Sequence, residues 1–271
     1  MTRFSPRQLS GHGVLLLLSA LTIFPLYWMV VTSLRPASDI VSVDLVPRAV
    51  TLDNYISVWR EIPIARMLVN TLLMSLIVTV AQVLTSLLAA YAFAAWTFPG
   101  SRLLFLLFVG TWLVPFQVTM IPNYVLLARL GWLNTLAALV VPQFVAAFAI
   151  ILLRQYMKAF PRDLLDASRI DGASSWRTLW LIVVPNLRAP LAALAILIFI
   201  SSWKEYFWPL LVTSKPEQSV VQVGLQMFLS QEGDSWGPLM AGATLACMPV
   251  FLLYLGLQRQ VTEAFVRSGL K

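Results

Sequence analysis

Charged residues are scarce in this chain. Only 11% of its 271 residues are charged, whereas 59% are apolar. Soluble globular proteins have about 25% charged and about 45–50% apolar residues. So few charges could not cover a surface that faces water, and the sequence therefore predicts an integral membrane protein with six or seven spans of about 20 residues. The net charge of +7 then indicates Lys and Arg held in cytoplasmic loops, and we expect no nucleic-acid partner.

Two residue types that carry much protein chemistry occur once each. Cys247 is the only cysteine and His12 the only histidine. A single cysteine excludes an internal disulfide and a cysteine-based metal cluster, and a single histidine excludes an HExxH zinc site or a multi-histidine centre. The sequence also lacks a G-x4-G-K-[ST] segment, so the chain has no P-loop with which to hold ATP. We expect no metal site, no cofactor and no catalytic residue in the chain.

Long uncharged runs are abundant instead. They predict six transmembrane helices near 13–33, 68–94, 103–126, 134–156, 188–212 and 237–258. No run alternates as barrel strands do, so the expected fold class is all-α, a polytopic bundle with 1–271 as one transmembrane domain. A signal peptide is the alternative for the first run. That run is longer than the usual apolar core, contains Pro25 and is followed by no clear cleavage site, so we interpret it as the first span.

The distribution of Lys and Arg predicts the orientation. With both termini in the cytoplasm, the inner segments and adjoining helix ends carry 12 basic and 4 acidic residues, and the outer segments carry 6 basic and 7 acidic residues. Basic residues are enriched in cytoplasmic loops. We therefore expect the N-terminus, the loop 157–187 and the C-terminus in the cytoplasm, and the segments 34–66 and 213–236 outside.

The cytoplasmic loop 157–187 has the pattern of a short helix, a break and a second helix. Pro161 suits a first helical turn, and Gly172 suits a left-handed cap that stops the helix. Ser174 or Ser175 can cap the next helix, which Pro185 ends. Polar and apolar faces are expected on the first helix, with Arg162, Asp166 and Arg169 on one and Leu164, Leu165, Ala167, Ser168 and Ile170 on the other. Such a stub is a docking element, or alternatively a surface helix at the lipid headgroups.

The same loop carries a resemblance to a known family. Its residues Asp166-Ala-Ser-x-x-x-Gly172, followed after nine residues by Ile182-Val-Val-Pro185, resemble the EAA motif of ABC importer permeases, E-A-A-x3-G-x9-I-x-L-P. Asp replaces Glu, Ser replaces the second Ala, and Val replaces Leu. Further segments resemble the second permease of the carbohydrate-uptake, maltose-type branch: Thr32-Ser-Leu-Arg-Pro36, Ile121-Pro-Asn-Tyr124, Leu130-Gly-Trp-Leu-Asn-Thr135 and Trp203-Lys-Glu-Tyr-Phe-Trp-Pro-Leu210.

The resemblance implies a type I (MetI-like) six-helix bundle with a cytoplasmic coupling helix. It implies a binding-protein-dependent machine in a bacterial or archaeal plasma membrane, with a second permease as heterodimer partner, two ATPase subunits that hold ATP and magnesium, and an extracytoplasmic binding protein. The residues expected to couple to an ATPase are Arg162, Asp166, Ala167, Ser168, Arg169, Asp171, Gly172 and Pro185. Those expected to contact the binding protein are Gln218, Gln231, Glu232 and Gly233.

Two charges lie inside the fifth predicted span. Lys204 and Glu205 are adjacent and point about 100° apart on a helix, so they cannot pair with each other as residues four apart do. A charge at the centre of a span costs about 2.5–3.5 kcal/mol. With Trp203, Tyr206 and Trp208, whose rings can stack on sugars, they form the predicted substrate path. The alternatives are that the helix ends early, leaving both charges at the outer headgroups, and that the tryptophans only pack helices.

The substrate class follows from the resemblance alone. It implies a sugar, an oligosaccharide or a polyol. The stretch 231–241 resembles members that import glycerol-3-phosphate, for which Lys204 would be a suitable cation, so this substrate or a glycerophosphodiester is the alternative.

Three other classes of membrane protein are alternatives to an importer permease. A secondary transporter would use intramembrane acids as proton relays, and only the Lys204–Glu205 pair qualifies. An intramembrane enzyme would need a Ser/His or Asp pair or a metal triad, and the predicted spans contain no His and no Asp. A channel would need a filter, and no segment resembles one. The sequence favours a transporter subunit that is not an enzyme.

Overall fold

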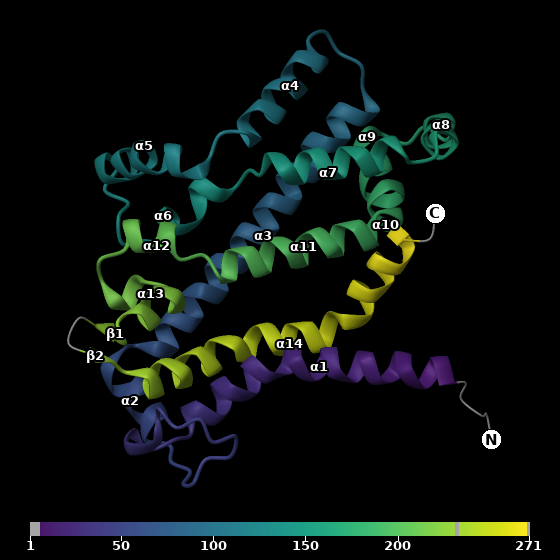
Figure 1. Cartoon of the computed structure of the whole chain (residues 1–271). Helices are drawn as coiled ribbons and strands as arrows, with labels where there is room; N and C mark the ends of the chain where they lie inside the picture. Colours follow the sequence, from purple (N-terminus) through teal and green to yellow (C-terminus); the bar gives the residue numbers. More distant parts are fainter. Residues whose placement is uncertain (1–5, 231–232, 270–271) are drawn as a thin grey trace. The chain divides into compact units, whose positions relative to one another are not determined.

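The computed structural model describes residues 6–230 and 233–269 of the protein (Figure 1). Its helices are α1 (Pro6–Ser33), α2 (Asp53–Glu61), α3 (Ile64–Ala95), α4 (Ser101–Trp112), α5 (Phe116–Arg129), α6 (Leu136–Val140), α7 (Ala147–Lys158), α8 (Arg162–Ile170), α9 (Ser175–Thr178), α10 (Val184–Asn186), α11 (Arg188–Trp203), α12 (Phe207–Val212), α13 (Val221–Gln226) and α14 (Trp236–Gly269). Short 3-10 turns are η1 (Ala37–Asp39), η2 (Val141–Gln143) and η4 (Pro216–Gln218), and η3 (Leu179–Val183) is a π-helix. The strands β1 (Leu229–Ser230) and β2 (Gly233–Asp234) form one antiparallel pair. The all-α prediction is confirmed.

The described residues contain up to six candidate membrane spans. Three are unbroken helices: Gly11–Ser33 in α1, all of α3, and Trp236–Gly256 in α14. Three more are bent pairs: α4 with α5 at 93°, Leu136–Gln143 with α7 at 45°, and Ser175–Asn186 with α11 at 80°. The predicted number of six is reached when each bent pair is counted as one span.

Two of the predicted continuous spans are broken near prolines. The predicted helix 103–126 is wrong as one rod, because α4 ends at Trp112 and α5 begins after Pro115. Proline lacks the N–H that would bond to the preceding turn and disfavours a helical residue before it. The predicted helix 134–156 is also broken, and its bend lies between Gln143 and Ala147, shortly after Pro142 of η2.

The fifth predicted span, 188–212, is also not one continuous helix in the structure. Helix α11 ends at Trp203, Lys204 is its C-cap, and α12 starts afresh at Phe207. An unbroken helix would require an N–H on Pro209 to bond to the carbonyl of Glu205, and proline has none. In the observed arrangement Pro209 lies in the first turn of α12, where its missing N–H costs nothing.

The chain contains two compact units, each described by itself. Unit 1 comprises residues 1–65 and 223–249, and unit 2 comprises residues 66–222 and 250–271. In unit 1 the buried side chain of Asn54 donates from Nδ2 to the carbonyls of Ser33 (2.9 Å) and Arg35 (2.8 Å). These carbonyls at the end of α1 would otherwise lack partners. Asn54 therefore caps α1 from α2.

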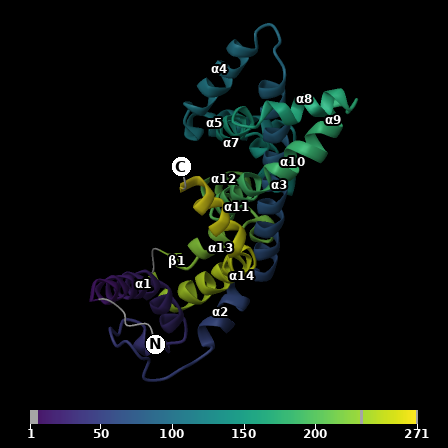
Figure 2. The same cartoon turned by 90° about the vertical axis from the view of Figure 1, so that its right-hand side faces the viewer.

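Unit 2 is built around α3. Buried apolar side chains of α3, such as Met74 and Leu87, belong to one core with Leu153 of α7 and Leu194 of α11. Helix α4 packs on α7, α7 on α11, and α12 on α5 and α6. Helices α8 and α9 lie beside the C-terminal end of α3, as Figures 1 and 2 both show. This arrangement holds the predicted coupling loop at one end of the unit.

Candidate functional site

Helix α8 presents most of the predicted coupling residues to solvent. Arg162 begins the helix, and its first turn contains Asp163, as suits the positive end of the helix dipole. Asp166 and Arg169 form an ion pair of 3.0 Å on the exposed side. Exposed pairs of this kind contribute about 0.2–1 kcal/mol. The ion pair therefore orders the two side chains on the polar face but contributes little to stability.

The apolar residues of α8 do not form the one face that the sequence predicted. Ser168 is buried and Leu165 is half-buried toward α3, whereas Ala167 is exposed and Ile170 is 87% exposed. Residues 167 and 170 lie on the side of the helix opposite to residues 165 and 168. The prediction of one compact apolar face is therefore wrong, because the bundle uses one side and leaves a second apolar strip facing outward.

The end of α8 is a Schellman motif. Gly172 has φ +73°, Ala173 N donates to Ser168 O (2.9 Å), and Gly172 N donates to Arg169 O (3.1 Å). Asp171 is the C-cap. The predicted left-handed cap at Gly172 is confirmed. Of the two serines proposed to cap the next helix, Ser174 does so by accepting from Arg177 N (3.4 Å).

Side-chain hydrogen bonds tie α8 and α9 to the bundle. The hydroxyls of Ser168 and Thr178 are 3.1 Å apart and both buried, and the Tyr91 hydroxyl of α3 donates to Ser175 O (3.2 Å). Pro185 is exposed in α10, directly after the π-turn η3. The chain then bends by 80° into α11. Side-chain hydrogen bonds thus connect α8 with α9 and α9 with α3, and the chain itself continues into α11.

The residues predicted for the substrate path separate into two groups. Trp203 is buried and stacks on Phe199 (5.7 Å between ring centroids), and Trp208 is fully buried and donates from Nε1 to Ala138 O (2.9 Å). Lys204 is exposed, and Tyr206 packs edge-on against its neighbour Phe207. Of the five predicted residues, only Glu205 lines the cavity described next.

A cavity of about 410 Å³ lies where α11 ends and where the chain breaks before α7. Its polar side chains are Gln82, Gln143, Ser201, Ser202 and Glu205. Gln82 Nε2 donates to Gln143 O (2.6 Å), and Gln143 Nε2 donates to Leu139 O (2.8 Å), which leaves both amide oxygens for other donors. The volume is within the range of about 300–1,000 Å³ that is usual for small-ligand sites.

The cavity offers carboxylate and amide oxygens as acceptors, together with two serine hydroxyls that can donate or accept. Glu205 Oε1 accepts from Trp208 N (3.3 Å), and its second oxygen is not engaged by the described residues. Carboxylate and amide oxygens accept hydrogen bonds from hydroxyl groups. Sequence reasoning missed Gln82, Gln143 and both serines, because it searched the spans for charges. Amide side chains inside an apolar run were the available signal, since polar groups are costly in a membrane.

A larger cavity is less suited to a polar ligand. It has about 600 Å³ and is lined mostly by apolar side chains of α7 and α11, among them Leu152, Pro190, Leu194 and Leu197. We therefore place polar-ligand chemistry in the smaller cavity. Among the described residues no group of three His, Cys, Asp or Glu side chains could hold a metal ion.

The predicted binding-protein loop is partly described. Asn70 of α3 donates from Nδ2 to the carbonyls of Glu217 (3.0 Å) and Ser219 (2.9 Å), and Asn134 Oδ1 accepts from Ser214 N (2.7 Å). Gln218 is half-buried in η4. Gly233 is in β2, and Gln231 and Glu232 lie outside the described residues. The described part 213–222 is thus held by fixed side chains.

Up to six candidate spans among the described residues, an exposed helix α8 and a polar cavity fit a membrane transport protein. Comparison with known proteins makes the assignment specific. The chain belongs to the family described as binding-protein-dependent transport system inner membrane component, whose profile matches residues 82–266. The chain is thus a multi-pass permease subunit of a binding-protein-dependent ABC importer, and the resemblance found in the sequence is confirmed.

Individual relatives cover nearly the whole chain. The arabinooligosaccharides transport system permease protein AraQ of Halalkalibacterium halodurans is 30% identical over 93% of this chain and 92% of its own length. The lactose transport system permease protein LacG of Rhizobium radiobacter is 30% identical, with 95% and 94% covered. The sn-glycerol-3-phosphate transport system permease protein UgpE of Yersinia enterocolitica is 32% identical, with 95% of each covered.

A solved structure shares the fold. It is the crystal structure of a bacterial ABC transporter involved in the import of the acidic polysaccharide alginate. Its matching chain has a TM-score of 0.81 and 20% identity, with 96% of this chain and 99% of that chain covered.

Proposed function

We propose that the chain forms, with a second permease, the path by which a sugar, an oligosaccharide or a polyol enters the cell. Two ATPase subunits would hold ATP and magnesium and supply the energy, and an extracytoplasmic protein would deliver the substrate. The residues 1–271 would act as one permease domain in the plasma membrane of a bacterium or archaeon. The observation that carries the substrate class is the cavity of acceptor oxygens around Glu205.

The charge of this cavity favours a neutral substrate over glycerol-3-phosphate. Glu205 is its only charged lining residue among the described side chains, and Lys204 is exposed elsewhere. A carboxylate repels a phosphate group and accepts hydrogen bonds from sugar hydroxyls. The relative that transports glycerol-3-phosphate keeps that substrate as the second candidate.

Energy coupling is proposed to pass through α8. Ala167 and Ile170 form the apolar strip that faces outward, next to the Asp166–Arg169 pair. An ATPase cleft that receives this strip would move α8, and the bonds of Ser168 and Tyr91 would carry the motion to α9 and α3. This is a rigid-body route to alternating access. Arg162, Asp171, Gly172 and Pro185 shape and position the stub.

The proposal includes an orientation. The excess of basic residues supports both termini and α8 in the cytoplasm and segment 213–236 outside. Gln218, Gln231, Glu232 and Gly233 would then be on the side from which the binding protein docks.

Co-purification tests the proposed assembly. The tagged chain, solubilised from its own membranes, should bring down a second permease and an ATPase. Ile170→Asp should lose the ATPase but keep the second permease, because it places a charge on the outward strip of α8. Ile56→Asp, which also changes an exposed isoleucine, is the matched control. If wild type brings down neither partner, the proposed assembly is wrong.

Uptake by reconstituted vesicles tests the substrate. The purified assembly with its binding protein should accumulate a neutral sugar when ATP is supplied on the α8 side. Uptake of glycerol-3-phosphate in place of every sugar or polyol offered would overturn the sugar assignment.

A further inference from the structure

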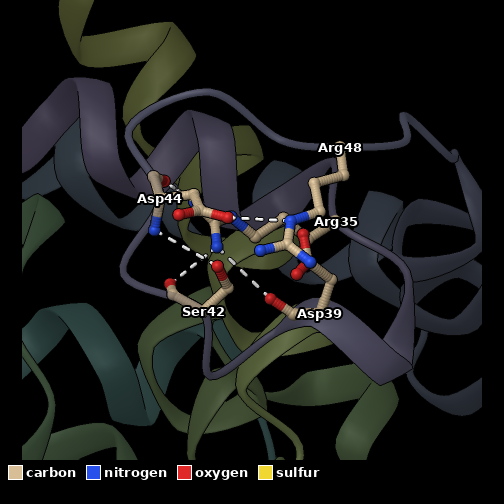
Figure 3. A network of polar contacts seen from close by, with 5 residues as sticks. All are labelled: Arg35, Asp39, Ser42, Asp44 and Arg48. Carbon is tan, nitrogen blue, oxygen red and sulfur yellow. Dashed lines mark hydrogen bonds and ion pairs between the residues drawn. The ribbon is translucent and has the colours of Figure 1, made fainter.

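A buried cation organises the segment that follows α1. Arg35 is fully buried, and its guanidinium donates to the carbonyls of Ser42 (2.6 Å), Asp39 (3.3 Å) and Asp44 (Figure 3). It also lies over the Trp28 ring, 5.1 Å from the centroid. Thr51 N donates to Leu34 O (2.9 Å) and closes the segment at its base. Residues 35–50 thus form a closed loop folded around a guanidinium, called the Arg35 loop below.

The Arg35 loop folds back along α1. The Tyr27 hydroxyl donates to Leu45 O (2.5 Å). Tyr27 precedes Ser33, the last residue of α1, by six residues, which corresponds to about 9 Å at 1.5 Å per residue. Because Gly11–Ser33 is a candidate span, the hydrogen bond from Tyr27 brings Leu45 O beside the last two turns of that span.

The outer side of the loop is apolar. Val41 is 88% exposed and Val43 is 84% exposed, and Leu45, Val46 and Val50 are exposed as well. Two of the charged residues of the loop, Asp44 and Arg48, form an ion pair of 2.9 Å.

These features together fit lipid better than water. Irregular backbone exposed to lipid does not occur within the hydrocarbon core, whereas at the headgroup–acyl boundary backbone groups without a protein partner can bond to water and headgroups. The carbonyls of Asp39, Ser42, Asp44 and Leu45 have protein partners in Arg35 and Tyr27. In water the same carbonyls would need no protein donor, and the five apolar side chains would be left unfavourably hydrated.

We propose that the Arg35 loop is embedded in the lipid bilayer, at the headgroup–acyl boundary beside the end of α1. Val43 and Val46 contact acyl chains, while Arg35 satisfies the loop carbonyls from inside. The loop is then a second membrane anchor next to the span. This proposal rests on the membrane family of the chain and not on the identity of its substrate.

Lipid-dependent fluorescence quenching tests the depth of the loop. Val43→Cys and Val46→Cys, each in a Cys247→Ser background, carry a bimane label in the assembly reconstituted into phosphatidylcholine–phosphatidylglycerol vesicles. Brominated acyl chains should quench both labels at least threefold more than they quench Glu217→Cys, an exposed position in the outer segment. Aqueous iodide should show the reverse order.

Two other results would overturn the proposal. Iodide quenching at 43 and 46 equal to that at 217 would place the loop in water. Resistance of both labels to both quenchers would show that protein, such as the second permease, covers the loop.

Variants of the two donors test the internal bonds. Tyr27→Phe removes one hydroxyl and should at least halve bromolipid quenching at position 43, whereas Tyr124→Phe, a hydroxyl loss in α5, should not change it. Arg35→Met should move the label at 43 toward the iodide sensitivity of position 217. If quenching is unchanged in both Tyr27→Phe and a folded Arg35→Met, the hydrogen bonds of Tyr27 and Arg35 do not hold the loop at its depth, and the proposal is wrong.

Discussion

The backbone at Gly237, in unit 1, has no room for a side chain. A Cβ at this position would meet Asn54 Oδ1, and it would come within 2.8 Å of Asn54 Cγ and Ile40 Cδ1. Asn54 cannot step aside freely, because it donates to Ser33 O and Arg35 O. Any side chain at 237 therefore competes with the cap of α1.

Gly237→Ala should therefore destabilise the protein. Forcing an extra methyl into a packed site costs about 1–3 kcal/mol, and each kcal/mol lowers the melting temperature by about 2–4 °C in a chain of this size. Thermal unfolding of the purified assembly measures it. Gly110→Ala is the control, since no atom of the described residues lies within 4 Å of a Cβ there. Equal melting temperatures for both variants would contradict the crowding at 237.

Glu205 and Lys204 are adjacent but should behave differently. Glu205 lines the cavity and Lys204 does not. A hydrogen bond to a charged group contributes about 1.5–3 kcal/mol and a neutral one about 0.5–1.5 kcal/mol, so Glu205→Gln should raise the KM for sugar uptake about fivefold. Lys204→Met should leave that KM within about twofold. The measurement is initial uptake at varied substrate-loaded binding protein, and an equal effect of both changes would argue against the cavity.

At the scale of the element, the Schellman motif makes α8 a short rod with a fixed end. Gly172 supplies the left-handed residue, and Ser168 on the buried side ties the rod to Thr178. The outward side leaves Ala167 and Ile170 exposed. A rod of this kind transmits displacement only while its end stays fixed.

Substitutions at Gly172 should change coupling rather than insertion. Alanine at φ +73° costs about 1–2 kcal/mol because of its Cβ, so Gly172→Ala should loosen the end of α8 and raise the ATP hydrolysed per sugar transported. Gly172→Asn should stay near wild type, since asparagine tolerates the left-handed conformation. Simultaneous ATPase and uptake assays give the ratio. A ratio unchanged in the alanine variant would show that the end of α8 need not be rigid.

At the scale of the whole molecule, the sequence predicts which side of the membrane each loop faces. Ser174→Cys and Glu217→Cys, in a Cys247→Ser background, place thiols in segments predicted to lie on opposite sides. A membrane-impermeant maleimide added to intact cells should label position 217 and not 174, and lysed cells should label both. Labelling of 174 in intact cells would reverse the predicted topology and remove α8 from the cytoplasm.

Much of the fold could be predicted because hydropathy and backbone chemistry are local properties. The apolar runs predicted six spans, and the stop at Gly172 followed from the conformational freedom of glycine. The breaks near Pro115, Pro142 and Pro209 could not be placed from hydropathy, because an apolar run has the same mean hydropathy whether it is straight or bent. Whether a proline kinks or breaks a span depends on which neighbours satisfy the freed carbonyls.

The cavity was hidden for a related reason. Gln82 and Gln143 are 61 residues apart, and nothing local in the sequence brings them together. The two tryptophans next to Glu205 were expected in the path, but their indole rings fill space between helices. Which face of α11 is buried depends on α7 and α3, and this is a property of packing.

The break before α7 has a consequence for how the cavity can open. Its freed carbonyls are held by another helix, because Gln82 donates to Gln143 O and Thr85 donates to Phe144 O (2.9 Å). Both donors belong to α3, so these two hydrogen bonds join the break to that helix. The bend before α7 is therefore attached to α3 at two points. We therefore expect this wall of the cavity to move together with α3 during a transport cycle, and the chain to flex at other positions.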